Sequence, residues 1–111
     1  MPRLHRTEKI ASVIEHELST LLLRELDVTA AVVTILNVEV SSDILQAMVT
    51  IGIIPYEEGP RVWEELMEKR RSLQHQLLKK MNIKPMPQIR FRIEEPEKVE
   101  EQAPEETVAQ E

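Results

Sequence analysis

The stretch LNVEVSSDILQAMVTIGI, from Leu36 to Ile53, decides the fold. Apolar and polar residues alternate up to Val40, and a second alternation runs from Leu45 to Ile53. Strict alternation places one set of side chains on each face of a β-strand. The segment 41–43, Ser-Ser-Asp, separates the two runs and consists of residues that favour turns. Together with the β-branched residues just before it, the stretch predicts an antiparallel hairpin over residues 30–54.

Two helices are predicted on either side of this hairpin. Over residues 8–26, apolar side chains recur at helical spacing, and Thr7 is a candidate N-cap. Pro60 suits the first turn of a second helix, which continues to about Met81. The buried stripe predicted for this helix is Trp63, Leu66, Met67, Leu73, Leu77 and Met81. Because an unbroken helix would span about 33 Å, a break near residues 69–72 is also considered.

A third strand is predicted near the end of the chain, where Ile89, Phe91 and Ile93 alternate with polar residues. The predicted order is therefore helix, strand, strand, helix (one or two), strand. A three-stranded sheet with the helices on one face would bury every apolar stripe. This arrangement is an α+β fold.

Length and composition limit the kind of protein this can be. A chain of 111 residues suits one domain, which we expect over residues 1–94. From Glu94 onward there are eight acidic residues and one lysine, so residues 95–111 are predicted to be an acidic, disordered tail. No cysteine is present, and no stretch is long and apolar enough for a membrane helix. The expected location is the cytoplasm, and the expected state is a monomer.

Catalytic and metal-binding patterns are missing from the sequence. The three histidines are far apart, and none forms a pair with the spacing that would let two of them bind one metal on a helix. The two glycines, Gly52 and Gly59, are too far apart to form a phosphate-binding loop. We therefore expect a binding protein rather than an enzyme, with no metal and no cofactor.

Charge is distributed unevenly along the expected domain. Residues 1–59 carry four bases and nine acids, whereas residues 60–93 carry nine bases and three acids. A basic region of this kind suits a phosphate backbone. The candidate RNA-binding residues are Arg3, Arg6, Lys9, Lys69, Arg70, Arg71, Lys79, Lys80, Lys84, Arg90 and Arg92. For the run 69–71, the alternative is a solvated helix face with weak ion pairs.

The kind of nucleic acid follows from the few aromatic residues. Single-stranded bases need aromatic platforms, and Phe91 is expected to face the core. Trp63 lies on the predicted apolar stripe and is interpreted as a core anchor, with an exposed binding role as the alternative. Structured RNA, recognised by shape and backbone, is the expected target.

Several segments, taken in order, resemble one known family. Residues 38–44, Val-Glu-Val-Ser-Ser-Asp-Ile, followed by Ala47 and Val49, resemble the hairpin of ribosome-binding factor A. The first helix is similar in its Lys-Ile-Ala and Glu-Leu-Ser segments, residues 9–11 and 17–19. Residues 87–91, Pro-Gln-Ile-Arg-Phe, resemble the last strand of that family. The resemblance covers about residues 3–94.

This resemblance implies a KH-like fold of the second type that lacks the Gly-x-x-Gly loop. It also implies binding to the small (30S) ribosomal subunit and its rRNA, with a role in late maturation and processing of 16S rRNA. The family has an alanine-x-glycine kink where this chain has residues 69–71, so the kink's small residues are absent. The alternatives are an RNA-binding regulator or a protein-interaction adaptor acting outside the ribosome.

Overall fold

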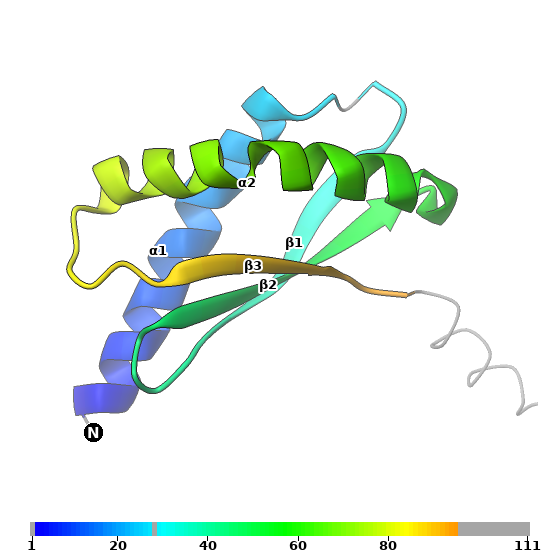
Figure 1. Ribbon diagram of the computed structural model, residues 1–111. Coiled ribbons are helices and arrows are strands. Elements are labelled where there is room, and N and C mark those ends of the chain that lie inside the picture. Colours follow the sequence, from blue (N-terminus) through cyan, green and yellow to red (C-terminus); the bar gives the residue numbers. More distant parts are fainter. Residues whose placement is uncertain (1, 28, 96–111) are drawn as a thin grey trace, which may run out of the picture.

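The computed structural model describes residues 2–27 and 29–95 of the chain. Its elements are α1 (Pro2–Glu25), β1 (Val32–Val40), β2 (Gln46–Ile54), a short 3-10 turn (Tyr56–Glu58), α2 (Gly59–Met81) and β3 (Gln88–Ile93). The strand order in the sheet is β1-β2-β3. Strands β1 and β2 are antiparallel, and β2 and β3 are parallel, so the sheet is mixed. The predicted α+β fold and its element order are confirmed (Figure 1).

The core lies between the helices and one face of the sheet. On β2, the buried apolar side chains are those at alternate positions 47, 49, 51 and 53, and on β3 Ile89 and Phe91 are buried on the same side. They form one cluster with apolar residues of α1 and α2. Figure 1 shows α2 crossing α1 on the side of the sheet that they cover. The opposite sheet face carries no helix within the described residues.

The hairpin turn is closed by hydrogen bonds of its own side chains. The Ser41 hydroxyl donates to Asp43 Oδ1 over 2.7 Å, and the Leu45 amide donates to the same oxygen over 3.1 Å. Both bonds lower the pKa of the Asp43 carboxyl, and the bond from Ser41 has the larger effect. Ile44 has a φ of 62°, a conformation that β-branched residues rarely adopt, and its buried side chain offsets this strain. The predicted role of segment 41–43 in setting the hairpin is confirmed.

Strand β1 contains a bulge that the sequence pattern does not reveal. The register with β2 shifts between Ile35 and Asn37, so one extra residue lies on β1. Val33 and Ile35 pack on the core before the bulge, and Val38 and Val40 do so after it. Leu36, at the bulge, is 52% exposed.

Two expectations for the helices are wrong. Helix α1 begins at Pro2, which is tolerated in a first turn, so Thr7 lies inside the helix and is not its N-cap. Trp63 and Met67 are each 37% exposed, so Trp63 is not a core anchor; Val62 joins the buried stripe of α2, in which Leu66, Leu73 and Leu77 lie as predicted. Helix α2 is continuous through residues 69–72, so the considered break is absent. Asn82, with a φ of 52°, ends it by donating its amide to the Leu78 carbonyl.

Candidate RNA interface

Strand β3 presents two arginines on the sheet face that the helices leave open. Gln88, Arg90 and Arg92 are exposed and alternate with the core residues of the strand. The Arg92 Nε donates a 2.8 Å hydrogen bond to Thr50 Oγ1, and Thr50 is only 4% exposed. The stem of Arg92 therefore lies over the middle strand. Arg90 and Arg92, two of the candidate RNA-binding residues, thus lie together on the outward face of the third strand.

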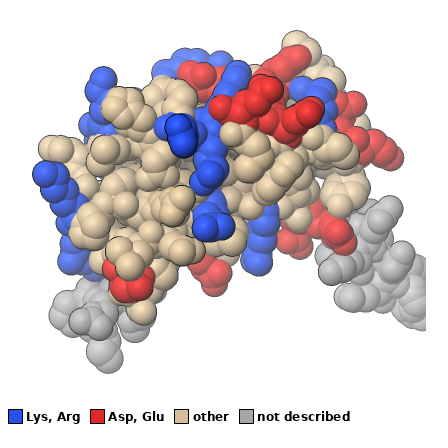
Figure 2. Space-filling model, viewed as in Figure 1, with Lys and Arg blue, Asp and Glu red and all other residues tan. Residues whose placement is uncertain are grey.

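Helix α2 adds two more arginines beside the start of this strand. Arg70 and Arg71 line a hollow of about 250 Å³ together with Gln74 and Gln88. Because Gln88 belongs both to this hollow and to the exposed face of β3, the hollow and the strand face adjoin. We call Arg70, Arg71, Arg90 and Arg92 the basic band. Figure 2 shows Lys and Arg gathered in such a band across α2 and the sheet.

Gln74 joins the two elements that form the basic band. Its Nε2 donates to the Pro87 carbonyl over 2.8 Å, and its Oε1 accepts from the Ile89 amide over 2.8 Å. One side-chain amide thus satisfies two backbone groups at the start of β3. This pair of bonds fixes the start of β3 along α2. It thereby also fixes the position of Arg90 relative to Arg70.

The arginines of the band and the lysine beside them differ in their partners. Lys69 Nζ donates to the Glu25 carbonyl and lies 3.5 Å from Glu65 Oε2, so it joins α2 to the end of α1. In the described part of the chain, Arg70, Arg71 and Arg90 take part in no hydrogen bond or ion pair. These three guanidinium groups are available to an external anion, and guanidinium pairs well with phosphate.

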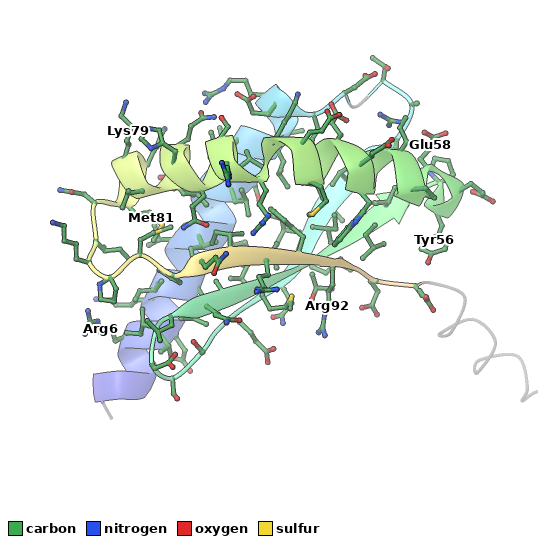
Figure 3. The ribbon with its side chains drawn as sticks, in the orientation of Figure 1. Arg6, Tyr56, Glu58, Lys79, Met81 and Arg92 are labelled. Atoms are coloured by element: carbon green, nitrogen blue, oxygen red, sulfur yellow. The ribbon has the colours of Figure 1, made fainter. Side chains whose placement is uncertain are left out.

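The other predicted bases lie at the end of the molecule where α2 finishes. Figure 3 places Lys79 and Arg6 at that end, apart from Arg92. Lys80 lies 3.6 Å from Glu17, a partly exposed pair that contributes little to stability. Lys9 and Lys84 are exposed. The side chain of Arg3 lies outside the described part, so its predicted role stays a prediction.

Two glutamines of this site were missed by inspection of the sequence. Gln74 and Gln88 carry no charge, and neither belongs to a known motif. The available signal was helical spacing, since Gln74 follows Arg70 by four residues and Arg71 by three and so shares their face. Gln88 shares its strand face with Arg90 and Arg92 by period two.

Metal chemistry and membrane insertion find no support in the described residues. Over 2–27 and 29–95, no group of three or more His, Cys, Asp or Glu could hold a metal ion. No helix in those ranges is long and apolar enough to cross a membrane. What the site offers is a set of arginines around an open sheet face.

Fold and site together define a small α+β domain in which one sheet face is covered by helices and the other faces outward with arginines. Residues 6–105 match the sequence model of the family described as Ribosome-binding factor A. The chain belongs to the ribosome-binding factor A family. The resemblance expected from the hairpin and its flanks is therefore confirmed.

Individual relatives support this assignment over most of their length. Ribosome-binding factor A of Pseudomonas paraeruginosa is 34% identical over 94 residues, which cover 81% of this chain and 73% of the relative. The protein of the same name from Chromohalobacter salexigens is 28% identical over 99 residues, covering 86% and 76%. That from Akkermansia muciniphila is 23% identical over 90 residues, covering 81% and 72%.

Proposed function

We propose that this chain is a cytoplasmic, monomeric assembly factor that binds the small (30S) ribosomal subunit and assists late maturation and processing of 16S rRNA. Family membership supports ribosome association, since the relatives are named as ribosome-binding factors. In this proposal the protein is not an enzyme and needs no cofactor. It acts by holding RNA.

The observation that carries the proposal is the basic band. It combines arginines from α2 and β3 on one side of the molecule, three of them without a partner among the described residues. The band contains no aromatic side chain on which an unpaired base could stack. Phosphates held at fixed spacing are the ligand that such a surface suits, as on a folded RNA.

The proposed mechanism is differential binding. If the band fits the phosphate spacing of one rRNA conformation better than that of another, the protein shifts the population toward the first. The shift cannot exceed the difference in binding free energy between the two conformations. Release follows when the rRNA reaches a state that the band fits less well.

Co-sedimentation with isolated ribosomal subunits tests the proposal. We expect saturable binding to small subunits that weakens as salt rises, because phosphate contacts release counterions. Large subunits serve as the control. Equal binding to both subunits, or binding that salt does not affect, would discard the proposal and favour a regulator or an adaptor acting outside the ribosome.

A charge-reversal variant extends the same test to the residues. Lys79→Glu, Lys80→Glu and Arg90→Glu together should reduce small-subunit binding at least tenfold without unfolding the domain. Arg24→Glu is the control, because Arg24 lies outside the candidate set and bonds to Gln76 on the protein itself. Unchanged binding by a folded triple variant would remove these residues from the interface.

A further inference from the structure

A second hollow lies at the opposite end of α2 from its basic C-terminal turn. Its lining is Tyr56, Gly59, Pro60, Trp63 and Ile93, and its volume is about 300 Å³. Four of the five lining residues have apolar or aromatic side chains, and Trp63 is 37% exposed. Figure 3 places Tyr56 at the end of the molecule where α2 begins. We call this the aromatic hollow.

The volume of the aromatic hollow limits its occupant. About 300 Å³ is at the lower limit for small-molecule sites, which suits one or two side chains of a partner. Exposed tryptophan and tyrosine are typical anchors of protein interfaces, because each provides a large contact area at a small loss of conformational entropy.

Charge around the hollow favours a protein partner over RNA. Glu57, Glu64 and Glu94 are exposed carboxylates next to lining residues in the chain, and no ion pair engages them within the described ranges. The neighbouring base, Arg61, lies 2.7 Å from Glu58 and 3.5 Å from Glu65, and these carboxylates raise its pKa. Figure 2 shows Asp and Glu concentrated at the end of the molecule where α2 begins. A phosphate backbone would be repelled here, whereas lysines and arginines would be attracted.

We propose that the aromatic hollow with its surrounding carboxylates is a docking site for a lysine- and arginine-rich protein segment that inserts one large apolar side chain. The apolar side chain fills the space beside Trp63, and the flanking bases face Glu57, Glu64 and Glu94. This site goes beyond the proposed rRNA contact and uses none of the arginines of the basic band. It would let the protein hold RNA and a basic polypeptide at the same time.

The chain's single tryptophan makes the site directly measurable, because Trp63 is the only indole in the protein. The probe is the synthetic peptide Lys-Lys-Leu-Phe-Lys-Lys, titrated against the full chain while Trp63 emission is recorded. We expect a saturable change of emission below about 1 mM peptide. Lys-Lys-Ser-Ser-Lys-Lys, with equal charge and no apolar group, and Glu-Glu-Leu-Phe-Glu-Glu should produce much smaller changes.

Variants separate the two components of recognition. The double variant Glu57→Gln with Glu64→Gln should lower the affinity for the apolar basic peptide roughly three- to tenfold, as expected for exposed ion pairs. The matched control is Glu15→Gln with Glu39→Gln, two exposed carboxylates on other elements, which should leave affinity unchanged. Small-subunit binding should be unaffected by the first pair, so loss of the proposed rRNA contact and loss of this site are distinguishable.

Several results would overturn the proposal. No emission change with the apolar basic peptide up to about 1 mM is one. Equal responses to the serine peptide would show that the hollow takes no side chain. A larger response to a single-stranded oligonucleotide would make Trp63 part of an RNA surface. A change of Trp63 emission that follows protein concentration in the absence of peptide would identify a second copy of this chain as the occupant.

Discussion

The two ends of α2 are chemically opposite although one continuous helix forms both. Its three acids, Glu64, Glu65 and Glu68, come before residue 69, and all its bases except Arg61 come after them, namely Lys69, Arg70, Arg71, Lys79 and Lys80. Lys79 and Lys80 lie in the last turn of α2, where the helix dipole favours bases, whereas its first turn contains no acidic residue. The order of the charges along α2 therefore produces an acidic, aromatic surface at one end and a basic surface toward the other.

The two surfaces also differ in how far their charges are engaged within the fold. At the acidic end, Arg61 is held by two glutamates, and Glu65 Oε2 accepts from the Asp27 amide over 3.0 Å. In the basic band, Arg70, Arg71 and Arg90 are without partners among the described residues. The comparison teaches that a basic side chain can be assigned to an external anion only once its partners within the fold are known.

The largest expected effect comes from removing a buried side chain of α2, the helix that contributes to both surfaces. Leu66 is completely buried near the middle of α2, so Leu66→Ala should lower the free energy of unfolding by about 2–5 kcal/mol. Urea denaturation measures this loss. Leu78→Ala is the control in the same helix, since Leu78 is 39% exposed and should lose less than about 1 kcal/mol. Similar losses in both variants would contradict the structure, in which Leu66 lies in the core and Leu78 is exposed.

A smaller effect is expected where α2 is joined to the basic strand. Gln74→Ala leaves the Pro87 carbonyl and the Ile89 amide without their partner, and should lower the free energy of unfolding by about 1–3 kcal/mol. Hydrogen exchange at the Ile89 amide should accelerate. Gln76→Ala, which removes only exposed bonds, should leave that amide unchanged. An unaltered Ile89 amide in Gln74→Ala would mean that other contacts hold β3.

Binding variants separate the band from the C-terminal turn of α2. Arg70→Ala with Arg71→Ala should weaken small-subunit binding about tenfold and reduce the slope of log affinity against log salt by up to about 2. Lys79→Ala with Lys80→Ala removes the same charge from the same helix and should weaken binding less. A greater loss from the lysine pair would move the interface to the end of the molecule near Arg6.

The smallest expected effect is a pH-dependent loss of stability when the carboxyl of Asp43 in the hairpin turn is replaced. The pKa of Asp43 is lowered mainly by Ser41, and that of Asp27 mainly by Thr29. A lowered carboxyl pKa contributes stability above the unfolded value, and this contribution disappears as the pH falls through about 4 and below. Asp43→Asn should therefore be less stable than the natural chain at pH 6, with the difference shrinking toward pH 3. Urea midpoints at the two pH values measure it, and a constant difference would contradict the assignment.

Local periodicity was sufficient to predict the hairpin, the third strand and the general position of both helices. Periodicity did not determine which face of α2 is buried, because Val62 and Trp63 are adjacent and either could begin an apolar stripe. Tertiary packing chose the smaller side chain for the interior and left the indole at the surface. The bulge at Leu36 was not predicted either: the core-facing residues change from positions 33 and 35 to positions 38 and 40, and the extra residue keeps both pairs on the same face of the sheet.

The candidate site was predictable in residue type but not in arrangement. Charge asymmetry identified Arg70, Arg71, Arg90 and Arg92, whose common surface depends on the parallel pairing of β2 with β3. No local pattern reports that Lys69 turns toward Glu25. Contacts between residues far apart in sequence decide which bases bind within the fold and which face outward.

The parallel placement of β3 beside β2 has a consequence for protein synthesis. Strand β3 follows the other elements of the described residues, yet it supplies half of the basic band and one wall of the core. As the polypeptide emerges from its own ribosome, the hairpin and both helices appear while that wall is still missing. The nascent chain thus completes the basic band only after residue 93 has been added. Under the proposed function, translation itself delays the moment at which the protein can bind a ribosomal subunit.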